Sequence, residues 1–358
     1  MKKILSYAAL VSLTFTGTAA MADGTDLSDM ERLGKRLYNS TELSLDRTQS
    51  CATCHHRTAG YADPVNAKDP YNSFVSLGDN LVDKGGRNAP TAAYCGFSPI
   101  LDQNENGDWQ GGMFWDGRAT GETLGDPLAE QAQGPPLNPV EMNMPDVQTI
   151  ISRIEASNMA SLFIKVFGPD ALKDADTAYN ALAEAIASYE RSAEVSPFNA
   201  RFDSGNLSAQ EEAGFALFMN NCASCHSTQI VANAPGPLFT NYQYENIGVP
   251  TNEALLADEG SVYDGNDRGL GYVIAGEDGK FKVPTLRNIA RTAPYSHNGY
   301  FPTLQAMVSF HNSRDVPEAN WPAAEIQTNL NTVDTGNMGL TPAQIDDIVV
   351  FLYSLTDQ

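Results

Sequence analysis

The sequence predicts a mainly α-helical protein made of two similar domains, each with a few helices and long irregular loops. Three observations predict this fold class. The pentad Cys-x-x-Cys-His occurs twice, at residues 51–55 and 222–226. A helix start of the pattern Ser-x-x-Glu precedes each copy, followed by apolar residues at helical spacing. Long segments rich in Gly, Pro and Asn, notably 57–145 and 229–303, separate the helical stretches.

The two pentads predict two covalently attached c-type haems. Two thiols three positions apart can each add to one vinyl group of a haem, and the following imidazole can then bind the iron. A structural zinc site would need a second Cys/His pair near each pentad, and a thioredoxin-type motif would not carry the trailing histidine. Two disulfide hairpins are the alternative, and they would leave both histidines unexplained. We therefore expect two cytochrome c-like helical domains, each around one haem bound by its pentad: Cys51, Cys54 and His55, and Cys222, Cys225 and His226.

The first 22 residues have the pattern of a signal peptide. Lys2 and Lys3 form a positive start, residues 4–15 are apolar, and Ala20-Met21-Ala22 is a small-x-small cleavage site. The apolar stretch is too short to span a membrane. Haem attachment to such pentads takes place outside the bacterial cytoplasm, so we expect a periplasmic protein whose mature chain begins at Asp23.

The chain is strongly acidic, with a formal net charge of −22. This charge argues against nucleic acid or an anionic membrane as partner, and it suits either a basic redox partner or a solubilising surface. Cys95 is the one cysteine outside the pentads, and we expect it to be a buried thiol.

An internal duplication orders the remaining elements. Residues 27–38 align with 207–218, and each stretch leads into a pentad. We expect an N-terminal haem domain at 23–195, a linker at 196–206 and a C-terminal haem domain at 207–340. Further helices are expected at 147–167, 178–191 and within 341–358, the last with Ile345, Ile348, Val349 and Leu352 on one face.

Several further motifs resemble the bacterial di-haem cytochrome c peroxidase/MauG family. They keep the family's order over nearly the whole mature chain: Gly-Arg-Asn-Ala-Pro-Thr at 86–91, Phe-Trp-Asp-Gly-Arg-Ala at 114–119, Glu-Gln-Ala at 130–132, Gly-Pro at 134–135, Asn-Pro-Val-Glu-Met at 138–142, Val-Pro-Thr-Leu-Arg-Asn at 283–288 and Thr-Ala-Pro-Tyr-Ser-His-Asn-Gly at 292–299. These motifs are specific to the family, but they do not fix the substrate.

The resemblance assigns roles to four residues around the first haem. Glu141 would be the acid/base that moves a proton between the two peroxide oxygens, and a carboxyl in an apolar pocket suits this task. Gln131 would orient bound peroxide or water, Pro135 would limit the room above the iron, and Trp115 would carry an electron between the haems. A surface carboxylate is the alternative for Glu141, and a packing anchor is the alternative for Trp115.

The resemblance also implies one calcium ion between the domains. Its ligands would be Asn88 and the backbone carbonyl groups of Thr292 and Pro294. Oxygen ligands from separate loops suit a calcium ion that joins two halves.

Two positions depart from the family pattern. Peroxidases of this family have a distal histidine where this chain has Asn80, next to Asp79, so we expect the first iron to be open on its distal side. At the second haem, peroxidases have a Met ligand and MauG has Tyr, whereas this chain has His311. Met307 is the alternative ligand, and His297 is expected near the haem without binding it.

Three functions follow from the resemblance. The first is a peroxidase that reduces hydrogen peroxide to water at the first haem, with electrons relayed through the second from a small cytochrome c or copper protein. The second is a MauG-like enzyme that uses peroxide-derived high-valent iron to oxidise a Trp or Tyr of a partner protein. The third, a non-catalytic electron carrier, has no use for an open iron beside Glu141. The family is often dimeric, so a homodimer is also an option.

Overall fold

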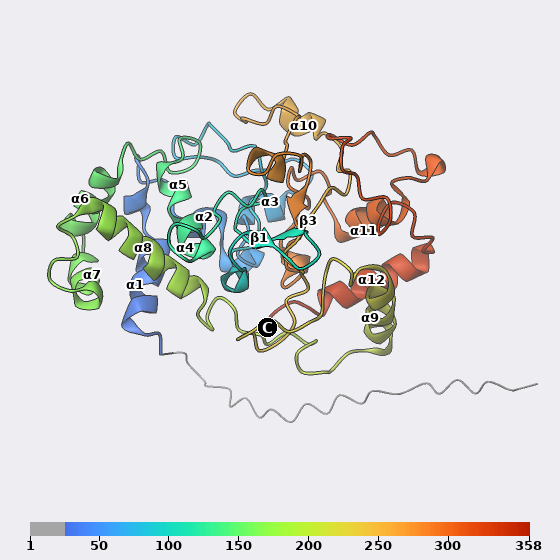
Figure 1. Ribbon diagram of the computed structural model, residues 1–358, viewed down its shortest axis with the longest axis horizontal. Coiled ribbons are helices and arrows are strands. Elements are labelled where there is room, and N and C mark those ends of the chain that lie inside the picture. The colour runs from blue at the N-terminus through green and yellow to red at the C-terminus, as the bar shows by residue number, and fades with distance from the viewer. Residues whose placement is uncertain (1–25) are drawn as a thin grey trace, which may run out of the picture.

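A computed structural model describes residues 26–358, and the expected signal peptide, residues 1–22, lies outside the described residues. The fold is mainly helical, as predicted, and it divides into a left-hand group of helices from the first half and a right-hand group from the second half (Figure 1). The helices are α1 Asp29–Tyr38, α2 Cys51–Cys54, α3 Pro64–Lys68, α4 Pro127–Ala132, α5 Gly134–Leu137, α6 Val147–Ala156, α7 Ala160–Phe167, α8 Ala175–Glu190, α9 Ala209–Asn221, α10 Glu253–Leu256, α11 Leu304–Ser313 and α12 Pro342–Tyr353.

Strands are few and short. Among the described residues, β1 Asp102–Gln103 pairs with β2 Trp109–Gln110, and β3 Tyr244–Glu245 pairs with β4 Phe281–Lys282, both antiparallel. The second pair places Tyr244 opposite Lys282. These strands lie between the two helix groups (Figure 1).

The predicted duplication is present in the first helix of each half. Both α1 and α9 begin with a full capping box, formed by Ser28 with Glu31 and by Ser208 with Glu211. In each helix a glycine lies against a second helix from the same half. A Cβ atom on Gly34 would overlap the carbonyl oxygen of Ala185 in α8, and one on Gly214 would overlap that of Asp347 in α12. Only glycine permits this close approach of two helices.

The cores follow the same division. The first core gathers around α1, α6 and α8, with residues such as Leu33, Ile150 and Leu182 fully buried. The second gathers around α9, α11 and α12, with Phe218, Phe310 and Phe351 at its centre. The predicted apolar face of the last helix is confirmed, because Ile345, Ile348, Val349 and Leu352 are all buried.

One helix prediction was wrong. The stretch 147–167 forms two helices, α6 and α7, because Ser157 adopts an extended conformation between them. Its hydroxyl donates to the carbonyl oxygen of Ile154 at 2.7 Å and accepts from the amide of Met159 at 3.1 Å. A serine side chain competes with the helix in this way for backbone partners. The helix expected at 178–191 begins three residues earlier, at Ala175, where Asp174 caps it.

The predicted linker at 196–206 contains no helix or strand, but it is anchored. Asp203 forms two hydrogen bonds with the fully buried Arg287 of the second half, at 2.6 and 2.8 Å. The end of the chain also returns to the first half, since the hydroxyl of Tyr94 donates to the carboxylate of Asp357 at 2.7 to 2.8 Å. The two halves are therefore held in one arrangement by buried polar contacts.

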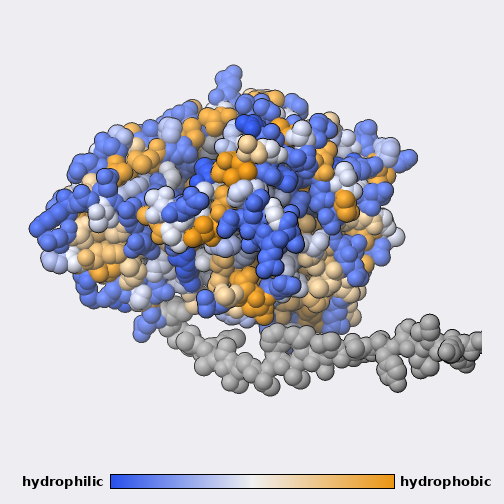
Figure 2. All heavy atoms as spheres, in the orientation of Figure 1, coloured by the Kyte–Doolittle hydropathy of each residue, from blue (hydrophilic) through white to orange (hydrophobic). Residues whose placement is uncertain are grey.

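The surface seen in Figure 2 is largely hydrophilic, with apolar residues scattered among polar ones. No helix within residues 26–358 is both long and apolar enough to cross a bilayer.

Candidate haem sites

The first pentad lies at the end of a short helix, and its histidine is held by the backbone. Cys51 and Cys54 begin and end α2, and both are free thiols. The Nδ1 atom of His55 lies 3.2 Å from the carbonyl oxygen of Tyr61. The carbonyl oxygen of Gly60, the residue before Tyr61, accepts a hydrogen bond from the hydroxyl of Thr91 at 2.6 Å.

The second pentad repeats this arrangement. Cys222 and Cys225 are also free thiols, and the Nδ1 atom of His226 lies 2.9 Å from the carbonyl oxygen of Phe239. The preceding carbonyl, that of Leu238, accepts from the hydroxyl of Thr285 at 2.6 Å. The free thiols in both pentads leave no disulfide hairpin, which removes the alternative reading of the motif.

Both pentad histidines are suited to bind iron. Burial lowers the pKa of His55 and of His226, which favours the neutral imidazole. A carbonyl oxygen beside Nδ1 holds the proton on that nitrogen and leaves the Nε2 lone pair free for a metal. Sequence reasoning missed the threonines that support these carbonyls. The available signal was the dipeptide Pro-Thr, which occurs at Pro90-Thr91 and again at Pro284-Thr285.

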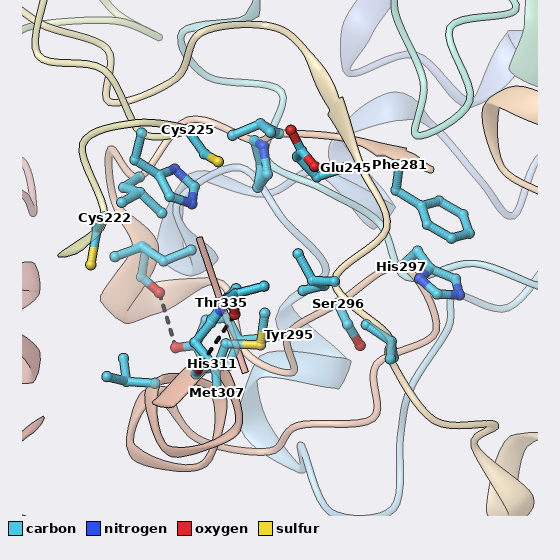
Figure 3. Close-up of a pocket in the computed structure, with 18 of the residues that line it drawn as sticks. Cys222, Cys225, Glu245, Phe281, Tyr295, Ser296, His297, Met307, His311 and Thr335 are labelled. Carbon is cyan, nitrogen blue, oxygen red and sulfur yellow. Dashed lines mark hydrogen bonds between the residues drawn. The ribbon is translucent and has the colours of Figure 1, made fainter. Parts of the chain in front are cut away.

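A large, mostly apolar cavity surrounds the second pentad (Figure 3). Cys222 and Cys225 lie at one end of the view, and His297 and Phe281 lie at the other. The two thiols are the groups that would hold a haem in this cavity by its vinyl groups. The cavity is lined on α11 by Met307 and His311, the two candidates for the second axial ligand.

His297 lies at the cavity wall in a fixed orientation. Its ring stacks on Phe281 with the centroids 3.6 Å apart, and its Nε2 atom lies 3.1 Å from Glu325. With Nε2 engaged by a carboxylate, His297 is better suited to support the cavity wall than to bind iron.

His311 has a hydrogen-bond partner of its own. Its Nδ1 atom lies 2.9 Å from the hydroxyl oxygen of Thr335. Burial lowers the pKa of His311 to about 3, and the nearby His226 and Arg314 add to the shift. The imidazole is therefore neutral at physiological pH.

Glu141 belongs to the loop that follows α5, close to the first pentad. Its carboxylate accepts a hydrogen bond from the side chain of Asn138 at 2.6 Å. Burial raises the pKa of Glu141, and Arg118 and Asn138 oppose the shift only in part. The charge of Glu141 also raises the pKa of Cys51 and of Cys54, although burial is the main cause for both thiols.

Gln131 and Pro135 lie on the two short helices before this loop. Gln131 is in α4 and is half-buried, and Pro135 is in the first turn of α5. The carbonyl oxygen of Pro135 accepts from the amides of Asn138 and Met142, both at 3.2 Å. These bonds fold the loop back on α5 and fix the place of Glu141.

The position that carries a histidine in related peroxidases is at the surface here. The side chain of Asn80 is exposed and donates to Asp83 at 2.7 Å. Its neighbour Asp79 is buried and accepts from the amide of Asp46 at 2.9 and 3.0 Å, so its carboxylate is already engaged. His56 is not a replacement for that histidine either, since its Nδ1 atom lies 2.8 Å from the hydroxyl oxygen of Thr58.

Trp115 bridges the two halves. Its indole nitrogen donates to the carbonyl oxygen of Asn88 at 2.9 Å, and its own carbonyl oxygen accepts from the amide of Lys282 at 2.9 Å. The adjacent residues are joined as well, because Arg87 binds Asp116 in the first half and Asp267 in the second, all at 2.6 to 2.7 Å. Burial opposes ionisation of Asp267, but Arg87 holds its pKa below the usual value.

The three residues expected to bind calcium line the same cavity as His226. Asn88 is buried and its amide nitrogen donates to the carbonyl oxygen of Phe74 at 2.9 Å, which leaves the amide oxygen for a cation. Thr292 and Pro294 lie two positions apart in the loop that precedes α11. Within residues 26–358 no group of three or more His, Cys, Asp or Glu forms a metal site, so an ion here would use neutral oxygen ligands.

The fold and the two pentad sites define a c-type cytochrome with two haem-binding halves. Comparison with known proteins gives the same answer. The family described as di-haem cytochrome c peroxidase matches residues 28–212, and the cytochrome c family matches residues 211–356. The chain therefore belongs to the di-haem cytochrome c peroxidase/MauG family and is a peroxidase-type oxidoreductase with two haems.

Similar proteins are found on both branches of this family. The methylamine utilization protein MauG of Paracoccus denitrificans is 36% identical over 96% of this chain and 92% of its own length. The cytochrome c peroxidase Ccp of Escherichia coli is 30% identical over 90% of this chain, which spans 57% of that protein. Among solved structures, a Y463M variant of the diheme peroxidase BthA from Burkholderia thailandensis superposes with a TM-score of 0.79, at 31% identity over 92% of this chain and 86% of that one.

Proposed function

We propose that this protein is a periplasmic peroxidase that reduces hydrogen peroxide to water at its N-terminal haem. Electrons would reach that haem through the C-terminal haem from a small cytochrome c or copper protein. The N-terminal haem, when bound, supplies the iron at which peroxide is reduced. The periplasmic location rests on the pattern of residues 1–22 and on the chemistry of haem attachment.

The observation that carries the proposal is the setting of Glu141. Desolvation raises the pKa of this half-buried carboxyl, which favours its protonated form and suits it to pass a proton to a neighbouring oxygen. Asn138 fixes one carboxylate oxygen, so the other is free to face a bound peroxide. Gln131 would orient that peroxide, and Pro135 would restrict its position.

An open distal side at the first iron is the second part of the proposal. The exposed Asn80 and the engaged Asp79 support it, because neither side chain is placed or suited to bind iron. The enzyme would then need no reductive activation. An EPR spectrum of the fully oxidised protein tests this directly: we expect one high-spin and one low-spin ferric haem, and two low-spin haems would refute it.

The route between the haems is assigned to Trp115. Its contacts support this role, since the indole bonds to Asn88 in the first half while the backbone carbonyl of Trp115 bonds to Lys282 in the second. The proposal includes His311 as the axial ligand opposite His226. It also includes one calcium ion at Asn88, Thr292 and Pro294, which would join the halves beside this tryptophan.

A MauG-like oxidation of a partner protein is the second candidate. Two observations favour it: the 36% identity to a MauG protein over almost the whole chain, and a residue other than Met at position 311. In this case the oxidising equivalents would leave through the second half toward a Trp or Tyr of the partner.

Turnover measurements separate the candidates. The proposed peroxidase should consume peroxide in steady state with reduced cytochrome c, with two equivalents of cytochrome oxidised per peroxide. A MauG-like enzyme should instead form a long-lived oxidised species when peroxide is added without reductant. A simple electron carrier would show neither behaviour, and that result would remove both enzymatic proposals.

A further inference from the structure

The distal side of the second haem cavity contains a residue that neither the motifs nor the family resemblance pointed to, Thr335. We propose that Thr335 is a positioning residue that presents the Nε2 atom of His311 to the iron of the C-terminal haem and lowers the reduction potential of that haem. This inference rests on the proposed role of His311 as the axial ligand.

The direction of the hydrogen bonds supports this role. The hydroxyl of Thr335 lies 3.2 Å from the backbone carbonyl oxygen of His311, which can only accept, and 2.9 Å from Nδ1 of the same residue. A hydroxyl has a single proton, so when Thr335 donates it to this carbonyl, the bond to the ring runs from Nδ1–H to the threonine oxygen. The Nε2 atom then carries the lone pair, and His311 and Thr335 are both seen at the cavity wall in Figure 3.

Thr335 is itself held in place by the C-terminal end of α11. The amide of Gly336 donates to the carbonyl oxygen of His311 at 2.7 Å, and the amide of Asp315 donates to that of Gly336 at 2.8 Å. Carbonyl groups in the last turn of a helix lack helical partners, and the segment 335–340 supplies them here. Asn312 fixes the far end of this segment through two hydrogen bonds to Leu340, at 2.8 and 3.1 Å.

The same arrangement exists on the other side of the cavity. His226 has its Nδ1 atom 2.9 Å from the carbonyl oxygen of Phe239, so both candidate ligands would offer Nε2 with the proton fixed on Nδ1. An acceptor at Nδ1–H makes an imidazole a stronger donor and favours the ferric state. Two imidazoles of this kind should give a lower potential than a histidine with a methionine.

Met307 is the competing ligand, because it lies one turn earlier on α11 and lines the same cavity. Ligation by Met307 would leave the polar ring of His311 at the wall of a mostly apolar cavity with only its Nδ1 atom hydrogen-bonded. The place of His311 in the cavity wall, with its Nδ1 atom engaged by Thr335, therefore fits a metal ligand better than a packing residue.

The test compares Thr335→Val, which removes the hydroxyl at nearly the same volume, with Thr335→Ser, which keeps it. The holoprotein is used, and the midpoint potential and the low-spin EPR signal of the second haem are measured. We expect the Val variant to raise the midpoint potential and to change the low-spin g values, while the Ser variant keeps both near the parent. Thr332→Val, at an exposed position in the same loop, is the matched control and should change neither.

Two results would overturn the role of Thr335: a Val variant with the parent's potential and g values, or a Ser variant shifted as far as the Val variant. His311→Ala and Met307→Leu separate this failure from failure of the ligand assignment. If Met307→Leu abolishes the low-spin signal and His311→Ala keeps it, then His311 is not the ligand and the inference fails with it. If His311→Ala abolishes it while Thr335→Val has no effect, only the positioning role is lost.

Discussion

The two halves of this protein hold their pentad histidines in the same way and differ on the opposite side of the haem. His55 and His226 both face a backbone carbonyl through Nδ1, and a threonine from a Pro-Thr pair fixes the preceding carbonyl in each half. The residue proposed for the opposite side is Glu141 in the first half and His311 in the second. Under this proposal, the two halves share the part that holds the haem and differ in the part that decides its chemistry.

This difference shows how one scaffold can support two tasks. An acid beside an open coordination position suits reaction with peroxide, because a proton must reach the leaving oxygen. A second imidazole fills that position and suits electron transfer, because the iron then changes its ligands little on reduction. Variants at matched positions in the two halves test this difference, and the largest effect is expected at the proposed acid of the first half.

The largest effect is expected from Glu141→Gln, which removes the acid of the first half at nearly constant volume. Loss of a positioned general acid costs about 10²- to 10⁴-fold in rate. We therefore expect peroxide reduction to slow by that order while haem content and the spectrum of the second haem stay unchanged. Steady-state kinetics and the pyridine haemochrome assay would measure both.

Glu122→Gln is the matched control for this variant, because Glu122 is an exposed glutamate in the loop before α4. It should keep the parent's rate. A Glu141→Gln variant that reduces peroxide at the parent's rate would remove Glu141 from the mechanism and leave a surface role for it.

The second test compares the helix crossings of the two halves. Alanine at Gly34 or Gly214 would force α1 away from α8, or α9 away from α12, since the added Cβ would overlap a backbone carbonyl. Overpacking of this kind costs about 1 to 3 kcal/mol of unfolding free energy. Gly85→Ala, where no atom lies within 4 Å of the added Cβ, should be nearly neutral.

Chemical denaturation of the three glycine variants would measure these differences. Similar losses at Gly34 and Gly214 would support an equivalent role in the two halves. A loss at only one of them would mean that the other crossing can relax, and that the two helix pairs are not equivalent.

Much of this fold could be predicted because its strongest signals are local in sequence. The pentads, the capping boxes at Ser28 and Ser208 and the apolar face of the last helix each lie within a few residues. The break at Ser157 was missed because the apolar periodicity continues across it. The contact between His311 and Thr335 spans 24 residues of irregular chain, and no local pattern could pair them. Family motifs named Glu141, but its hydrogen bond to Asn138 and its partial burial required the folded loop.

The third test concerns a position in the last long helix of each half, where the first half has a buried carboxyl and the second has leucine. Glu190 in α8 is buried, and its Oε2 atom has no hydrogen-bond partner among the described residues. The helix crossing aligns Ala185 and Tyr189 with Asp347 and Phe351, which pairs Glu190 with Leu352 in the second half. Burial raises the pKa of Glu190 to about 8.

The sign of the resulting pH dependence follows from this shift. Between the ordinary carboxyl pKa and about 8, the folded state holds a proton on Glu190 that the unfolded state has lost. Stability contributed by the neutral acid is therefore present at low pH and is lost as the pH rises through this window. Glu190→Gln should remove the dependence and stabilise the protein by roughly 1 to 3 kcal/mol at pH 9 relative to the parent. Denaturation at pH 5 and pH 9 would show this, and equal pH dependence in the two proteins would contradict it.

The smallest effect is expected from the threonines that support the pentad histidines. Thr91→Val and Thr285→Val each remove one buried hydrogen bond to a carbonyl, which typically costs about 1 kcal/mol. Because these threonines act on the histidines only through the chain, we expect a small stability loss in each half and a small change in the potential of the haem in that half alone. Redox titration with separate detection of the high-spin and low-spin haems would measure it. If Thr91→Val altered the second haem instead, the supports would not be local to each half, and the close similarity of the two histidine settings would have no functional meaning.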